Sequence, residues 1–281
     1  MKIRLGISTC PNDTFTFHAL AAKEVSLHGL NFEIDYLDVQ ELNEQMIKGT
    51  YDVAKVSCYA AAAHGSSWVM LPSGSALGFG VGPLVLGSPS RPSPAPHEDP
   101  DRPSPLVLCP GRWTTATLLW RLFHPEKVRL EQTVFSEIIP ALEQGRADLG
   151  VCIHEARFVW RERGLDRVED LGETWESATS TPLPLGGIAG QKALGEEVLR
   201  RVQEAIRASL VWGLEHRDAC LASMRTHAQE ESDEVLWKHV ELYVNEWTLD
   251  LGATGREALR SVSRLATERG LLTAGAELEV L

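Results

Sequence analysis

His154 is the residue of this sequence best suited to acid–base chemistry. It follows an apolar segment, residues 150–153, that is typical of a buried strand, and Glu155 comes directly after it. Because imidazole titrates near neutral pH, a histidine placed at a strand end can act as a general base. A histidine at a helix start is more often structural, so the residues alone leave both roles open.

A polar segment at the first strand-to-helix junction is a second candidate for binding. In residues 8–15, Pro11 is expected to end the strand, and Asn12 or Asp13 is expected to cap the helix. Ligands of α/β sheets bind at such carboxyl-end loops. Ser8 and Asn12 are therefore the ligand-facing candidates here, although a well-capped helix alone would explain the segment.

Two further segments could hold an acidic group. Thr114 and Thr115 offer two hydroxyls and free amides at an expected helix N-terminus, although simple capping by Thr114 also explains them. Residues 55–57, which are Lys55, Val56 and Ser57, follow another expected strand and supply an ammonium and a hydroxyl. An exposed lysine is usually only a solvated charge, so this assignment also stays open.

Other chemistries lack their sequence signals. The glycine-rich residues 74–82 have neither the Lys-Ser/Thr of a P-loop nor the helix of a dinucleotide-binding motif, so a turn is expected there. No HExxH motif, ligand-spaced carboxylate pair or nucleophile elbow is present. We therefore expect no metal and no cofactor. The five widely spaced cysteines indicate buried thiols, and His18, His227 and His239 are expected to be structural.

The composition restricts the partners. A formal net charge of −12 argues against nucleic acid or an anionic membrane surface, which need clustered Lys and Arg. No apolar run approaches the roughly 20 residues that a membrane-spanning helix needs. The first residues lack the pattern of a secretory signal. We expect a soluble, cytoplasmic protein that captures a small anionic ligand by a local feature.

The elements that must position these residues alternate along the chain. The expected strands cover residues 2–7, 32–37, 53–56, 69–72, 82–87, 106–109, 128–132, 148–153 and 187–190. The expected helices cover residues 14–23, 39–47, 114–123, 136–144, 154–163, 196–216, 217–227, 232–247 and 254–269. Residues 88–105 include seven prolines and are expected to form an exposed loop.

This order predicts an α/β protein with two lobes, built on mixed, mostly parallel sheets flanked by helices. We expect residues 1–86 and 189–281 to form the larger lobe, with a helical C-terminal tail, and residues 87–188 to form the smaller one. Two α/β lobes joined by two crossings are typical of the type II periplasmic-binding-protein fold, whose ligand lies in the cleft between lobes. The fold alone does not distinguish an enzyme from a receptor.

Motifs spaced over nearly the whole chain resemble those of the 1,4-dihydroxy-6-naphthoate synthase family. They begin with Ser8-x-Cys10-Pro11-Asn12-Asp13-Thr14-Phe15 and continue through residues 55–57, 74–84, 110–115, 153–158, 183–186 and 227–235. Two features depart from the family pattern. Thr9 stands where the family commonly has proline, and residues 88–105 look like an insertion.

The resemblance implies a cofactor-independent lyase of the futalosine pathway of menaquinone biosynthesis. Such enzymes convert cyclic dehypoxanthine futalosine to 1,4-dihydroxy-6-naphthoate by cleaving a carbon–carbon bond. The family's proton acceptor falls on His154, and its substrate-contacting segments fall on Lys55 to Ser57 and on Thr114 and Thr115.

Two other functions stay open at this point. Chorismate dehydratase of the same pathway resembles this family in fold and also lacks a cofactor, but the residues 10–15 motif and the Ile153-His154-Glu155 run favour the naphthoate synthase. A non-catalytic protein that binds a small anion is the other alternative. The lack of an export signal counts against such a receptor.

Overall fold

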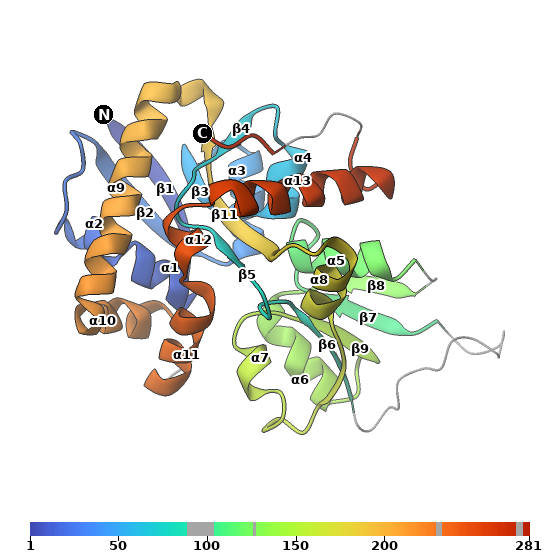
Figure 1. Cartoon of the computed structure of the whole chain (residues 1–281). Helices are drawn as coiled ribbons and strands as arrows, with labels where there is room; N and C mark the ends of the chain where they lie inside the picture. The colour runs from blue at the N-terminus through green and yellow to red at the C-terminus, as the bar shows by residue number, and fades with distance from the viewer. Residues whose placement is uncertain (89–103, 126–127, 229–231, 274–277) are drawn as a thin grey trace. The chain divides into compact units, whose positions relative to one another are not determined.

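The strands form two separate sheets, each with its own helices (Figure 1). The computed structural model describes residues 1–88, 104–125, 128–228, 232–273 and 278–281. The chain divides into a larger unit, residues 1–78 with 181–281, and a smaller unit, residues 79–180. Most of the expected proline-rich loop, residues 88–105, lies outside the described residues.

The sheet of the larger unit combines parallel and antiparallel strands in the order β2-β1-β3-β11-β4, with β5 also paired to β11. Their bounds are β1 Lys2–Ser8, β2 Asn31–Leu37, β3 Val53–Ser57, β4 Trp68–Met70, β5 Ala76–Gly78 and β11 Leu183–Gln191. Strand β1 runs parallel to β2 and β3, whereas β11 is antiparallel to β3, β4 and β5. The fold class is as expected, but parallel pairing does not predominate in this sheet.

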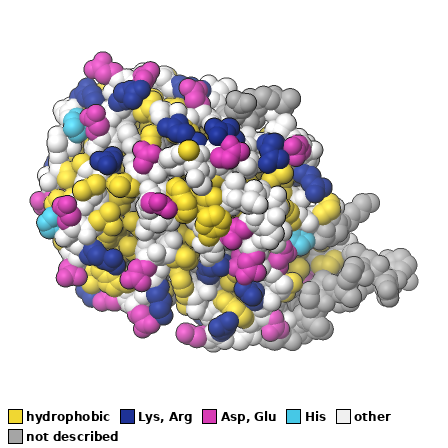
Figure 2. Space-filling view, in the orientation of Figure 1, with side chains coloured by type: hydrophobic (Ala, Val, Ile, Leu, Met, Phe, Trp, Pro, Cys, Tyr) yellow, Lys and Arg dark blue, Asp and Glu magenta, His cyan; other side chains and the backbone are white. Residues whose placement is uncertain are grey.

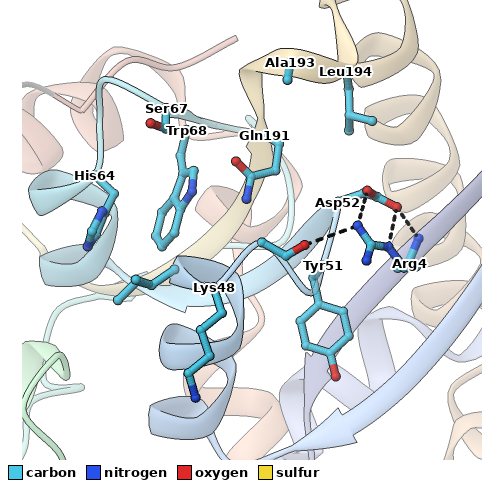
Figure 3. A pocket seen from close by; sticks show the side chains of 12 residues that line it. Arg4, Lys48, Tyr51, Asp52, His64, Ser67, Trp68, Gln191, Ala193 and Leu194 are labelled. Carbon is cyan, nitrogen blue, oxygen red and sulfur yellow. Dashed lines mark hydrogen bonds and ion pairs between the residues drawn. The ribbon is translucent and has the colours of Figure 1, made fainter.

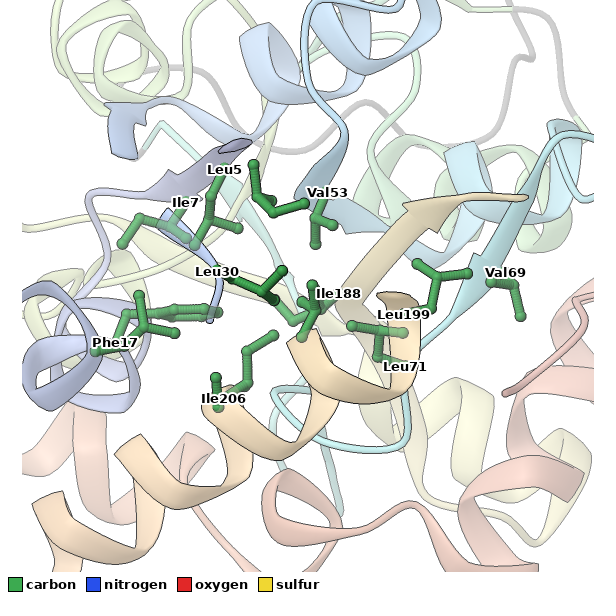
Figure 4. Close-up of a cluster of buried hydrophobic side chains, with 14 residues drawn as sticks. Leu5, Ile7, Phe17, Leu30, Val53, Val69, Leu71, Ile188, Leu199 and Ile206 are labelled. Atoms are coloured by element: carbon green, nitrogen blue, oxygen red, sulfur yellow. The ribbon is translucent and has the colours of Figure 1, made fainter. Parts of the chain in front are cut away.

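The core of the larger unit follows from the alternation in β1. Ile3, Leu5 and Ile7 are fully buried, while Lys2 and Arg4 are exposed. The buried side chains pack against the apolar face of α9 (Glu196–Glu215), including Leu199 and Ile206 (Figure 4). Each fully buried side chain of this size contributes about 1.5–3 kcal/mol. This core fixes β1, and through the sheet β3, whose last residues carry the polar groups described below.

The expected helix over residues 14–23 is two short helices, α1 (Pro11–Thr16) and α2 (His18–Ala22). Helix α1 starts earlier than expected because Pro11 occupies its first turn, where the missing N–H costs no hydrogen bond. The prediction that Asn12 or Asp13 caps this helix is wrong. Both residues lie inside the helix, and the N-cap residue, Cys10, makes no side-chain capping bond.

The smaller unit has a five-stranded sheet in the order β10-β6-β9-β7-β8. Its strands are β6 Leu84–Gly87, β7 Leu106–Cys109, β8 Arg129–Gln132, β9 Leu149–Cys152 and β10 Asp166–Asp170. Its helices are α5 Thr115–Phe123, α6 Ile138–Glu143, α7 Ala156–Val159 and α8 Leu171–Thr179, with a 3-10 turn at Phe135–Glu137 before α6. Strand β7 is parallel to β8 and β9, whereas β6 is antiparallel to β9 and β10.

Several expectations for the crossings between the units need correction. Each boundary falls eight residues earlier than expected, because β6 pairs with strands of the smaller unit while β11 begins at Leu183 in the larger sheet. The proline-containing stretch from Leu183 is thus part of a nine-residue strand, in which Pro184 pairs with the three-residue β5. The expected helix over residues 154–163 contains only the four residues of α7.

The C-terminal helices belong to the larger unit. They are α10 Arg217–His227, α11 Asp233–Tyr243, α12 Glu246–Leu249 and α13 Gly252–Glu268. The expected helix over residues 232–247 breaks because Asn245 and Thr248 form a capping box that starts α12. Met224 of α10 and Leu236 of α11 pack with Phe15 of α1, so these helices hold the loop that follows β1.

The surface is rich in charges of both signs. Figure 2 shows Lys and Arg side chains interspersed with Asp and Glu on the visible face. Ion pairs such as Arg200–Glu196 and Arg260–Glu257 lie on exposed helix faces. Among the helices that the structure describes, none is long and apolar enough to span a membrane.

Candidate active site

A buried ion pair lies beside the carboxyl ends of β1 and β3. Lys55 Nζ of β3 is 2.5 Å from Asp13 Oδ1 of α1, and their side chains are only 6% and 3% exposed. The same ammonium donates to the carbonyl oxygen of Gly74 at 3.2 Å. An ammonium carries three N–H donors. Two of them bind described residues, Asp13 and Gly74. Lys55 is therefore a held, charge-compensated donor, not the solvated charge that an exposed lysine would be.

Ser8 and Asn12 complete the shell of the Asp13 carboxylate. Ser8 Oγ, at the last residue of β1, donates to Asp13 Oδ2 at 2.5 Å, and Asn12 Nδ2 donates to Asp13 Oδ1 at 3.0 Å. Cys10 N–H in turn donates to Ser8 Oγ at 3.2 Å. Three of the predicted site residues, Ser8, Asn12 and Lys55, thus meet on Asp13, which was predicted only as a helix cap.

Ser57 is held by Asn43, a residue that no sequence motif selects. The Ser57 N–H donates to Asn43 Oδ1 at 2.9 Å, and Asn43 Nδ2 donates to Ser57 Oγ at 3.0 Å. Asn43 is fully buried on α3 (Val39–Ile47). With its oxygen accepting from Asn43, the hydroxyl of Ser57 can donate its own proton to a ligand. Between Lys55 and Ser57, Val56 is fully buried and pairs through its backbone with Gly187.

We predict that Asn43→Ala destabilises the protein by about 1–3 kcal/mol, because the buried Ser57 N–H loses its acceptor. It should also lower kcat/KM for the reaction proposed below, since the Ser57 hydroxyl loses its orientation. Urea denaturation and steady-state kinetics measure the two effects. Glu44→Ala, an exposed position on the same helix, is the control and should change stability by less than about 0.5 kcal/mol. Equal stability of both variants would contradict the role given to Asn43.

In the smaller unit, Thr114 is the N-cap of α5, as one of the two open interpretations expected. Its Oγ1 accepts from Thr117 N–H at 3.2 Å and donates to the Gly111 carbonyl at 2.8 Å. Thr115, the first residue of the helix, is buried. Because the Thr114 hydroxyl is already hydrogen-bonded in the cap, ligand binding by Thr114 and Thr115 stays a prediction.

His154 has an unusual backbone conformation. Its φ of +57° lies in the left-handed region, which costs most non-glycine residues about 1 kcal/mol or more. The side chain is half-buried, and its ring centroid lies 4.7 Å from that of Phe135 at an interplanar angle of 54°. Non-glycine residues held in this region are concentrated at functional sites. Lys23 and Ser180, which share this conformation, are helix C-caps, a role that His154 does not have, so the conformation makes His154 a candidate for a functional role.

The candidate residues of the smaller unit share one edge of its sheet. Strands β7, β8 and β9 run parallel, so the loops after them emerge at the same edge. These loops carry Thr114, Phe135 and His154, respectively. Gln132 Oε1 at the end of β8 accepts from the Gly111 N–H at 3.0 Å and so ties the first two loops together. The sheet thus presents a base, hydroxyls and an apolar ring side by side.

Thiol chemistry is disfavoured at two buried cysteines near these groups. Burial raises the pKa of Cys58, which follows Ser57, to about 12, although the Lys55 charge acts in the opposite direction. Burial likewise raises the pKa of Cys109, at the end of β7, to about 12. Both thiols stay protonated near neutral pH and are poor nucleophiles. Within the described residues, no group of three His, Cys, Asp or Glu side chains is arranged to hold a metal.

A pocket of about 380 Å³ lies elsewhere in the larger unit (Figure 3). Its lining includes Arg4, Asp52 and Trp68, which lie near the starts of β1, β3 and β4. This is the opposite edge of the sheet from Ser8 and Ser57. Arg4 Nη2 lies 2.9 Å from Asp52 Oδ1, so its charge is compensated. None of the predicted site residues lines this pocket.

The fold and the two residue clusters define a class of protein, the proteins with the periplasmic-binding-protein fold. The alkanesulfonate-binding protein of Xanthomonas axonopodis pv. citri superposes with a TM-score of 0.70 over 99% of this chain and 98% of its own, at 12% identity, which shows the fold alone. A protein from Archaeoglobus fulgidus matches with a TM-score of 0.86 and 28% identity, covering 96% of this chain and 98% of its own.

Within this class, the chain belongs to the menaquinone biosynthesis family, whose family model matches residues 3–268. It is 41% identical over 269 residues to the 1,4-dihydroxy-6-naphthoate synthase of Thermus thermophilus, covering 96% of this chain and 95% of that protein. It is 37% identical over 277 residues to the corresponding synthase of Streptomyces coelicolor, covering 97% and 95%. The predicted family is confirmed, as is the predicted fold class.

Proposed function

We propose that this protein is a lyase that converts cyclic dehypoxanthine futalosine to 1,4-dihydroxy-6-naphthoate. Two relatives of at least 37% identity over 95% of their length carry the name of that synthase, which supports the assignment. The observation that carries it is the placement of His154 in a left-handed backbone conformation at the edge shared with Thr114. Without such a base, the same fold would serve a binding protein as well as an enzyme.

In the proposed reaction, His154 removes a proton from the bound substrate. The electron pair left behind forms a new π bond as a carbon–carbon bond breaks, and the small sugar-derived fragment leaves with the pair of the broken bond and takes up a proton. Formation of the aromatic naphthalene ring supplies the driving force. A positioned base contributes about 10²–10⁴-fold to the rate. The rest depends on orientation of the substrate and exclusion of water.

The substrate oxygens have defined candidate partners. We assign the substrate's acidic group to the larger unit, with donors from Lys55 and from the Ser57 hydroxyl, whose positions Asp13 and Asn43 fix. Within the smaller unit, taken by itself, the proposed donors are Thr115 and the Thr114 segment. Ser8 and Asn12 act chiefly through Asp13, since their side chains already bind its carboxylate.

The test is a chromatographic assay of the purified protein with the cyclic substrate, without added metal or nucleotide. Appearance of 1,4-dihydroxy-6-naphthoate supports the proposal. Chorismate is incubated in parallel, and its dehydration would assign the protein to the other reaction of the pathway. Tight binding of the cyclic substrate without any product would instead identify a receptor and exclude the catalytic role of His154.

A further inference from the structure

Phe135 lies against the imidazole of His154 and has no role in the proposed proton transfer. We propose that Phe135, together with Val134, forms the apolar contact for the bicyclic ring of the substrate and of the naphthoate product, and thereby determines specificity for bicyclic over smaller acids. This inference rests on the proposed function, because it concerns the same site.

The first support is the contact itself. The centroids of the Phe135 and His154 rings are 4.7 Å apart, and the planes are tilted by 54°. Neither side chain is fully buried. A ring in this position limits the orientations of the imidazole and offers its remaining surface to whatever the imidazole acts on. Aromatic pairs favour offset or tilted arrangements, so a planar substrate ring can pack beside both.

The second support is that Phe135 is not a core residue. The hydrophobic core of the smaller unit includes Ile138 and Leu142 from the helix that follows, but it does not include Phe135. Val134, directly before it, is 55% exposed. Two adjacent apolar side chains outside the core leave apolar surface in water, which the apolar face of a ligand can cover.

The third support is that this segment is held in place at the correct edge of the sheet. Thr133 N–H donates to the Cys109 carbonyl at 3.0 Å, and Glu137 N–H donates to the Val134 carbonyl at 3.0 Å. The apolar pair therefore sits on a backbone tied to the strand that precedes the Thr114 loop. A fixed apolar surface costs little ordering on binding and suits a rigid, flat ligand better than a flexible one.

The chemistry of the ligand matches this surface. The naphthoate product is a flat aromatic bicycle with a carboxylate, so it needs both polar donors and an apolar face. In the smaller unit, Thr115 and the Thr114 segment serve the oxygens, whereas Phe135 and Val134 serve the ring. A monocyclic acid such as benzoate reaches the same donors with a smaller apolar face and gains less from Phe135.

The test compares Phe135→Ala and Phe135→Leu with the wild-type protein. We expect Phe135→Ala to lower kcat/KM about tenfold and to weaken binding of 1,4-dihydroxy-6-naphthoate by a similar factor, with weak benzoate binding unchanged. Phe135→Leu, which keeps apolar volume, should recover part of the loss. Val168→Ala changes another exposed apolar residue of the same unit, 45% exposed, and should behave as wild type.

Direct binding of 1,4-dihydroxy-6-naphthoate, measured by calorimetry, keeps this test separate from that of the proposed function. If the wild type binds the naphthoate but does not turn the cyclic substrate over, the proposed function fails while the role of Phe135 is still decided by the binding data. Naphthoate affinity and kcat/KM of Phe135→Ala within twofold of wild type, or an equal loss of benzoate binding, would overturn the inference. So would an absence of naphthoate binding by the wild type.

Discussion

His154→Asn is expected to lose turnover by about 10²–10⁴-fold while the protein keeps its fold and its affinity for the substrate. Asparagine tolerates the left-handed backbone conformation of this position better than other side chains do, so the substitution adds no backbone strain. It removes the base, because an amide does not accept a proton near neutral pH. Single-turnover kinetics, substrate binding by calorimetry and thermal unfolding measure the three quantities.

The chain offers a matched control for this substitution. His28 also has a positive φ, +48°, but it is exposed and belongs to the larger unit, near α2. His28→Asn makes the same chemical change on the same kind of backbone and should leave turnover unchanged. Turnover of His154→Asn within about threefold of wild type would remove His154 from the mechanism. A parallel loss in both variants would point to a general effect of the substitution.

The parts of the fold that could be predicted are those with a strong local signal. Helix α3 begins and ends where expected because Asp38 caps it and its apolar residues recur at helical spacing. The polar strand β10 was missed because it lies at a sheet edge, where Asp166, Arg167 and Glu169 need no alternation with apolar residues. The antiparallel pairing of β11 was missed because strand direction depends on contacts distant in sequence.

The residue types of the candidate cluster around Asp13 could be selected from the sequence, but their partners could not. Ser8 and Asn12 were identified from their strand-end position, whereas Lys55, expected after a strand, lies inside β3; all three meet on Asp13. The residue that joins them, Asp13, had an ordinary local explanation as a cap. Phe135 lies between an expected strand and an expected helix, and no sequence signal selects it. Only tertiary contacts distinguish these roles, because the same side chain can serve a core or a site.

The buried pair of Lys55 and Asp13 leads to the second large effect. Asp13→Asn and Lys55→Met should each destabilise the protein by about 3–5 kcal/mol, because each leaves one buried charge without its partner. The double variant Asp13→Asn/Lys55→Met should recover most of that loss, since it buries no charge. Urea denaturation of the four proteins gives the coupling energy of the pair.

Activity measurements on the same variants distinguish a purely structural role of the Lys55–Asp13 pair from a role in substrate binding. Although the double variant regains stability, it should regain no activity, because Lys55 is proposed to donate to the substrate and Met has no donor. Single-residue changes in the exposed pair Arg200–Glu196, whose side chains are 61% and 68% exposed, should cost less than about 1 kcal/mol and leave kcat/KM unchanged. Recovery of activity together with stability would make the buried pair purely structural. Additive losses in the double variant would show that the two charges do not stabilise each other. The proposal that a charge-compensated Lys55 binds the acidic group of the substrate would then fail.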